Sequence, residues 1–219
     1  MYKKNLSVVC SVTKRSVQYL DLLSKNKFKL YSVILYKNKK FKNPVLFRKI
    51  LLLLKKYSHK FIIVQNTNIN NKKFFKTIIK NSKRNILLSL YPGEVVKNLQ
   101  LMKKRHCFHN HTGRLPDYKG STTIYYSILR ERKIYCTTFR INREIDGGKI
   151  FYLNRYKLPK KRVNLDDYDN IIRAKNFVNF LKGKTWKNKT SLHSETYYTI
   201  HPILRNLAYK VTNGNLDIR

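Results

Sequence analysis

The sequence predicts an α/β protein with a Rossmann-like, doubly wound and mostly parallel sheet that carries helices on both faces. Short apolar runs alternate with longer amphipathic stretches through the first half of the chain, which is typical of βαβ units. An apolar content of 42% and an aromatic content of 13% suit a packed core. No linker-like stretch divides the 219 residues, so we expect a single catalytic domain over residues 1–219.

The expected strands are short runs rich in β-branched and aliphatic residues, and most are bounded by turn residues or lysines. We expect them at 6–12, 29–36, 60–66, 85–91, 135–141 and 151–159, with a further short strand leading into His109. No Gly-x-Gly-x-x-Gly follows the first strand and no P-loop is present. The sheet is therefore expected to lack the usual dinucleotide loop.

The expected helices show apolar residues at helical spacing, and Pro44 suits a first turn. We expect them at 16–26, 44–58, 71–82, 94–104, 168–183 and 201–210. Gly183 is a natural C-cap, and His201 is interpreted as a helix-start residue. The lone Trp186 is expected to pack or to line the rim of a cleft.

Three of the seven aspartates, Asp166, Asp167 and Asp169, form an acidic patch. A metal cluster is one interpretation, but carboxylates at a helix start cap the helix and offset its dipole, which we favour. No metal is expected. Cys10, Cys107 and Cys136 form no Cys-x-x-Cys pair, which argues against a disulfide frame or a zinc site and favours a reducing cytoplasm.

The formal net charge is +37, from 48 Lys and Arg against 11 Asp and Glu. Such a balance favours polyanions, which include nucleic acid, anionic membranes and phosphorylated substrates. The lysines are spread along the chain, however, and alanine occurs only at Ala174 and Ala208. A/T-rich codons explain most of the charge on this interpretation, and a nucleic-acid partner stays an alternative. No apolar run is long enough to span a bilayer.

Two polar residues follow expected strands. His111 lies just before a Gly-containing turn, and Asp146 lies between Ile145 and two glycines. The carboxyl ends of parallel strands form the ligand-binding edge of such sheets, so we expect both side chains there. A His with an Asp can manage protons during attack on a carbonyl, and a further polar donor can hold the oxyanion.

The segment "HNHTGRLPDYKGS" resembles the Asn-x-His-x-x-x-Leu-Pro-x-x-x-Gly signature of the folate-dependent formyltransferases. His111, Leu115, Pro116 and Gly120 stand in register. The later "IYCTTFRINREIDGGKI" resembles the family's strand followed by Asp-x-Gly, which Asp146 and Gly148 match. The upstream "ILLSLYPGEVV" resembles the family's strand and loop at the pterin pocket.

The resemblance implies formyl transfer from 10-formyltetrahydrofolate to a primary amine, without a metal. His111 would stabilise the oxyanion, and Asp146 would orient it and carry protons. Gly113 and Arg114 would contact the substrate. Backbone groups near the pterin ring would come from two loops, represented by Pro92, Gly93, Glu94 and Val95 and by Asn142 and Ile145.

The sequence departs from the family signature at one position. The signature has an asparagine two residues before its histidine. That position holds His109 in this chain, and Asn110 falls one place later. A one-residue slip turns a strand side chain to the opposite face. Three interpretations stay open: His109 donates in place of the amide, a bulge delivers Asn110, or the site is impaired.

The acceptor amine follows from the family resemblance less directly. Members formylate glycinamide ribonucleotide, initiator methionyl-tRNA or amino sugars on nucleotide carriers, and the tRNA enzymes carry a further C-terminal domain. The chain leaves little room for one after Ile150, so we expect a small phosphorylated or nucleotide-linked amine. The alternatives are a methionyl-tRNA formyltransferase-like activity, or a degenerate fold that serves as a basic nucleic-acid-binding protein.

Overall fold

The computed structural model describes residues 5–39, 43–57, 60–159, 163–184 and 194–214. The chain divides into two compact units. Unit 1 comprises Met1–His109 with Arg140–Arg143, and unit 2 comprises Asn110–Phe139 with Glu144–Arg219. The expected single domain stays a prediction.

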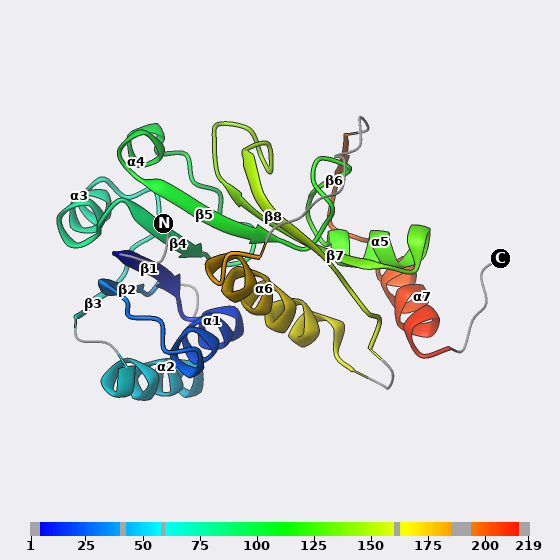
Figure 1. Cartoon of the computed structure of the whole chain (residues 1–219), viewed down its shortest axis with the longest axis horizontal. Helices are drawn as coiled ribbons and strands as arrows, with labels where there is room; N and C mark the ends of the chain where they lie inside the picture. Colours follow the sequence, from blue (N-terminus) through cyan, green and yellow to red (C-terminus); the bar gives the residue numbers. More distant parts are fainter. Residues whose placement is uncertain (1–4, 40–42, 58–59, 160–162, 185–193, 215–219) are drawn as a thin grey trace. The chain divides into compact units, whose positions relative to one another are not determined.

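The strands of unit 1 form a parallel sheet in the order β3-β2-β1-β4-β5 (Figure 1). They are β1 (Leu6–Ser11), β2 (Ser32–Tyr36), β3 (Phe61–Val64), β4 (Asn85–Ser89) and β5 (His106–His111). The chain moves outward from β1 to β3 and then crosses back to β4, as a doubly wound sheet does. The sheet continues into β7 and β8, to seven strands. The expected fold class is confirmed.

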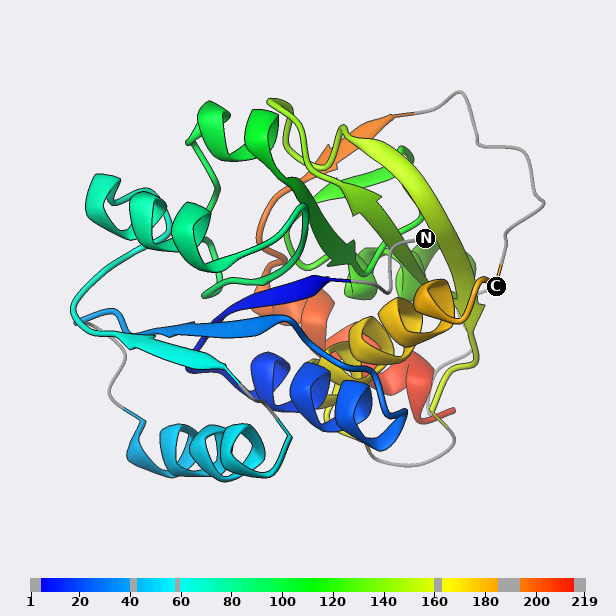
Figure 2. The same cartoon turned by 60° about the vertical axis from the view of Figure 1, so that its left-hand side comes forward.

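Helices cover both faces of the unit 1 sheet: α1 and α2 lie on one face, and α3 and α4 on the other (Figure 2). Their bounds are α1 (Lys14–Lys25), α2 (Pro44–Tyr57), α3 (Lys72–Asn81) and α4 (Leu99–Lys104). The expected helix over 94–104 begins only at Leu99, because Asn98 caps it by accepting the N–H groups of Gln100 and Leu101.

Unit 2 holds the rest of the strands and helices. They are β6 (Tyr118–Gly120), α5 (Thr123–Glu131), β7 (Ile134–Arg140, whose last residue belongs to unit 1), β8 (Lys149–Tyr156), α6 (Leu165–Leu181), β9 (Glu195–Tyr197) and α7 (Pro202–Thr212). Helix α5 packs against α7 around buried Ile128 and Ala208, while α6 packs against β8. Strands β6 and β9 form a separate parallel pair. Sequence reasoning had not anticipated β6, α5 or β9.

The helix-start interpretation of the acidic patch is confirmed for Asp166 and Asp167, which lie in the first turn of α6, although α6 begins at Leu165 and not at the expected residue 168. Asn164 is the N-cap of α6 and accepts the N–H groups of Asp166 and Asp167. Asp166 pairs with Arg205, whereas Asp169 is buried. His201 is likewise confirmed as a helix-start residue, because it caps α7.

Trp186 lies outside the described residues. Within the described ranges, no helix combines the length and the apolarity that a membrane crossing requires.

Candidate active site

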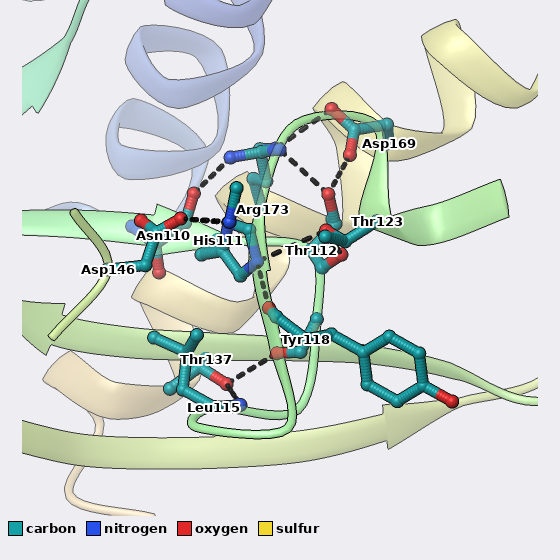
Figure 3. A network of polar contacts seen from close by, with 12 residues as sticks. Asn110, His111, Thr112, Leu115, Tyr118, Thr123, Thr137, Asp146, Asp169 and Arg173 are labelled. Atoms are coloured by element: carbon teal, nitrogen blue, oxygen red, sulfur yellow. Dashed lines mark hydrogen bonds and ion pairs between the residues drawn. The ribbon is translucent and has the colours of Figure 1, made fainter. Parts of the chain in front are cut away.

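His111 is the last residue of β5 and belongs to unit 2. The residue is buried, with 3% of its surface exposed. Its ring is held at both nitrogens (Figure 3). Nε2 lies 2.7 Å from the carbonyl oxygen of Tyr118 and 3.1 Å from Oγ1 of Thr123. Nδ1 lies 3.4 Å from Oδ2 of Asp146. The structure thus brings together the two residues that the sequence singled out.

The neighbours of His111 fix its tautomer. A carbonyl oxygen only accepts, so Nε2 carries the hydrogen that is donated to Tyr118. In the neutral ring Nδ1 is then unprotonated, and any proton that the ring takes up is held at Nδ1 facing Asp146. Burial lowers the pKa of His111, as does the charge of Arg173, while Asp146 raises it; the balance is a lowered pKa. The lowered pKa favours the neutral form of the ring.

Asp146 lies in the loop between β7 and β8 with a left-handed backbone (φ 53°). Its Oδ2 accepts the N–H of Gly120 at 2.9 Å. Gly120 needs to be glycine, because its φ is +96° and a Cβ there would lie 2.2 Å from the carbonyl oxygen of Tyr197. The close contact of β6 with β9 therefore presents the N–H that orients the Asp146 carboxylate.

The side chain of Asn110 contacts a different set of residues from the set that surrounds the His111 ring. Its Oδ1 accepts a hydrogen bond of 2.5 Å from the hydroxyl of Thr138, and Asn176 of α6 donates to the same hydroxyl oxygen at 2.9 Å. Successive strand residues point to opposite faces, and Asn110 follows this alternation. Oδ1 of Asn110 is thus committed to a buried contact, whereas its buried Nδ2 has no hydrogen-bond partner among the described residues; the interpretation in which a bulge delivers Asn110 to the site stays open.

His109 belongs to the part of β5 assigned to unit 1. It is half-buried, and its Nδ1 lies 3.4 Å from the carbonyl oxygen of Leu88. Strand alternation places His109 on the same face as His111. The expected replacement of the family asparagine by His109 stays a prediction.

The guanidinium of Arg114 is already engaged inside unit 2. It contacts Asp117 at 2.5 Å and Glu131 at 3.1 Å, and it stacks over the ring of Tyr135 at 5.0 Å. Its expected contact with a substrate stays a prediction. Gly113 has no side chain that could contact a substrate. Its carbonyl oxygen accepts a hydrogen bond of 2.6 Å from Thr137 on β7.

The expected pterin loop, Pro92 to Val95, follows β4 in unit 1. The Glu94 carboxylate is directed inward, where it accepts the Tyr36 hydroxyl, the Ile69 N–H at 2.9 Å and the Tyr91 N–H at 3.3 Å. Burial and this carboxylate raise the pKa of Tyr36. Pro92, Gly93 and Val95 are exposed, and the carbonyl oxygen of Val95 accepts a hydrogen bond of 2.8 Å from Asn70. The expected contact of this loop with a pterin stays a prediction.

The second expected pterin segment is split between the units. Asn142 belongs to unit 1 and Ile145 to unit 2. Both residues are exposed, and 59% of the surface of Ile145 is accessible. Their expected part in binding stays a prediction.

Sequence reasoning missed the residues that hold the imidazole. The Tyr118 carbonyl is a backbone group and carries no side-chain signal. Thr123 begins α5 in "GSTTIYY", where a small hydroxyl residue before an apolar run is a recognisable helix-start signal. Asp169 and Arg173 stand at the i,i+4 spacing of a helix ion pair, but nothing in that spacing reveals that the pair is buried.

The fold and the site together define an α/β protein of the doubly wound type, with a His–Asp pair at the carboxyl end of a central strand. No protein-family model matches the sequence. Over 161 residues the chain is 25% identical to the bifunctional polymyxin resistance protein ArnA of Wigglesworthia glossinidia brevipalpis, across 73% of this chain and 24% of that protein.

Over 151 residues the chain is 24% identical to the methionyl-tRNA formyltransferase of Buchnera aphidicola from Schizaphis graminum, across 67% of this chain and 48% of that protein. The chain spans less than half the length of these curated relatives.

Solved structures have the same fold. A sugar N-formyltransferase from a Shewanella species aligns with a TM-score of 0.60 at 14% identity, over 97% of this chain and 90% of that one. The phosphoribosylglycinamide formyltransferase of Streptococcus pneumoniae aligns with a TM-score of 0.59 at 12% identity, over 82% and 98%. The chain is therefore related to the formyltransferases and has their fold, which confirms the resemblance carried by "HNHTGRLPDYKGS".

Proposed function

We propose that the chain transfers a formyl group from 10-formyltetrahydrofolate to the primary amine of a small phosphorylated or nucleotide-linked molecule. The observation that carries this proposal is the 3.4 Å approach of His111 Nδ1 to Asp146 Oδ2, in a chain whose relatives include formyltransferases. A buried neutral imidazole facing a carboxylate is suited to receive the proton that an attacking amine releases.

The proposed reaction uses the pair twice. The amine nitrogen bonds to the formyl carbon, and the electrons of the C=O double bond move to oxygen. The proton released by the nitrogen passes to His111 and is held at Nδ1 beside Asp146. The resulting imidazolium stabilises the nearby negative oxygen. The proton then goes to the leaving N10 of the folate as the C–N10 bond breaks, which restores the neutral ring.

The same proposal assigns the binding of the folate to backbone groups of exposed loops. Pro92, Gly93 and Val95 are exposed after β4, and the inward Glu94 carboxylate fixes that loop through the Tyr36 hydroxyl and two N–H groups. A loop held in this way can offer backbone donors and acceptors to a ring that carries both. Asn142 and Ile145 are assigned to the same ligand.

The test is formyl transfer measured with three acceptors: glycinamide ribonucleotide, a nucleotide-linked amino sugar and methionyl-tRNA. We expect turnover with one of the two small acceptors, and a loss of roughly 10²-fold or more in Asp146→Asn, since general acid–base catalysis contributes about that much. Asp21→Asn is the matched control, because Asp21 pairs with Lys25 on the surface of α1. Failure to bind folate at millimolar concentration, or an unimpaired Asp146→Asn, would contradict the proposal.

A second candidate function is favoured by the net charge of +37. Such a charge suits a polyanion, and several curated relatives are methionyl-tRNA formyltransferases. A chain that binds nucleic acid as its main role should bind RNA with an affinity that falls steeply as salt rises. Folate binding in a confined site should change little with salt, so the two titrations, run side by side, separate the candidates.

A further inference from the structure

A second polar cluster in unit 2 lies behind the His111–Asp146 pair and is not used by the proposed reaction. It consists of Arg173 and Asp169 on α6, Thr112 after β5, and the carbonyl of Asn110 (Figure 3). Arg173 is 9% exposed and Asp169 is 8% exposed. Nε of Arg173 lies 2.8 Å from Oδ2 of Asp169, one helical turn earlier.

The guanidinium holds the chain on both sides of His111. Nη1 donates to the carbonyl oxygen of Asn110, the residue before it, and Nη2 donates to the hydroxyl of Thr112, the residue after it, at 2.7 Å. That hydroxyl in turn donates to Asp169 Oδ1. Each of the three guanidinium nitrogens of Arg173 thus donates to an acceptor, and each carboxylate oxygen of Asp169 accepts a hydrogen bond.

The same cluster reaches the imidazole itself through one more residue. The carbonyl oxygen of Thr112 accepts the hydroxyl hydrogen of Thr123, and Oγ1 of Thr123 lies 3.1 Å from Nε2 of His111. A shift of Thr112 would move Thr123 and the imidazole with it. The contacts of Arg173 therefore bear on the position of the ring through the backbone and through a hydroxyl.

We propose that Arg173 is a positioning residue for His111: its planar fork fixes Asn110 and Thr112 so that the imidazole faces Asp146. This inference rests on the proposed formyl transfer. A buried ion pair contributes little net stability compared with apolar packing of the same volume, because both charges lose their hydration. Since stability alone does not account for the Arg173–Asp169 pair, we assign the pair a role in holding the geometry around His111.

The charge of Arg173 acts on the same ring. His111 is faced by the charged groups of Asp146, Arg173 and Asp169, and the guanidinium lowers its pKa while both carboxylates raise it. Arg173 thus favours the neutral imidazole that accepts a proton. Lysine keeps the positive charge but is a point donor without the planar fork, so Arg173→Lys separates the loss of geometry from the loss of charge.

The experiment compares wild type with Arg173→Lys and with Arg205→Lys. Arg205 also binds an aspartate, Asp166, but on the surface. Three quantities are measured: kcat and KM for formyl transfer, the thermal unfolding midpoint, and the ¹⁵N chemical shifts of the His111 ring as pH is varied. We expect kcat of Arg173→Lys to fall on the order of tenfold to a hundredfold with KM little changed, since small misplacements at a site cost about that much. The His111 ring signals should shift, and Arg205→Lys should match the wild type.

A folded Arg173→Lys with unchanged kcat, or with unchanged His111 ring signals, overturns the proposal, and so does a loss of stability alone. Should Arg173→Lys not fold, Thr112→Val decides, because it removes the hydroxyl that both Arg173 and Asp169 bind. Thr112→Ser keeps that hydroxyl and is expected to recover most of what Thr112→Val loses. If the wild type transfers no formyl group, the proposed function fails, whereas the ring signals still decide whether Arg173 positions His111.

Discussion

A Cβ atom on Gly113 would lie 2.7 Å from Nε2 of His111 and 2.7 Å from the carbonyl oxygen of Tyr118. These two atoms are hydrogen-bonded to each other. The missing side chain of Gly113 is therefore what allows the imidazole to lie against the turn. The glycine of "HTGRLP" is required by close approach, and not by a left-handed backbone.

Gly113→Ala is expected to displace the imidazole and to lower kcat for formyl transfer on the order of 10²-fold, because an added methyl cannot share the space of the ring. Gly183→Ala is the control. Gly183 has open space but a φ of +81°, so its replacement should cost stability and leave kcat per folded molecule unchanged. Equal kcat in both variants would contradict a role for this close approach.

The lowered pKa of His111 predicts a dependence of stability on pH. The unfolded chain keeps the ordinary value of 6.5, while burial lowers the pKa in the folded chain, so the unfolded state binds more protons between the two values. The stability linked to His111 is complete above pH 6.5 and is lost as the pH falls toward the folded pKa. Denaturant unfolding of His111→Gln should show a flatter decline below pH 6.5 than wild type. A His201→Asn variant, which alters an exposed ring, should decline as wild type does.

His109→Asn tests the departure from the family signature. The carbonyl oxygen of Leu88 accepts from Nδ1 of His109 at 3.4 Å, which leaves Nε2 of the neutral ring an acceptor that cannot donate to an oxyanion. An asparagine amide can donate. We expect His109→Asn to raise kcat, by up to about 10²–10³, the usual worth of one oxyanion donor. A fall in kcat would instead show that His109 has a role of its own.

Glu94→Ala is expected to destabilise the chain by about 1–3 kcal/mol or more, because the buried Tyr36 hydroxyl and the Ile69 N–H would lose their acceptor. The measurement is urea unfolding at neutral pH. Asp21→Ala removes a carboxylate that is ion-paired on the surface and should change the free energy of unfolding by less than about 1 kcal/mol. A similar effect of both variants would show that the Glu94 contacts add no stability.

Much of unit 1 follows from local sequence pattern. Pro44 begins α2, as expected, because its fixed φ suits a first turn. Asn71, where the sequence placed the start of the third helix, is the N-cap of α3. Helix α4 begins later than apolar spacing suggests, since Asn98 caps it. The approach of His111 to Asp146 was predicted from the sequence, but not for the expected reason, because β7 runs antiparallel to β5. Ile141, just after β7, donates its N–H to the carbonyl oxygen of Cys107, near the start of β5.

Other features depend on contacts distant in sequence. Strand β6 has three residues and pairs Tyr118 with Glu195, so its own pattern is too short to predict it. The burial of Arg173 depends on where α6 packs, because an aspartate and an arginine at i,i+4 are usually solvated. The engagement of Arg114 by Asp117 and Glu131 is likewise visible only in the fold.

Strand β9 has a consequence for truncated forms of the chain. Gly120 donates to Asp146 from β6, and in the described part of the chain β6 is paired with β9 alone. A shortened chain ending before Glu195 would keep both His111 and Asp146 yet lose the strand that holds Gly120 in place. Proteolysis just before Glu195 would therefore abolish the proposed activity, although the lost fragment carries none of the reacting groups.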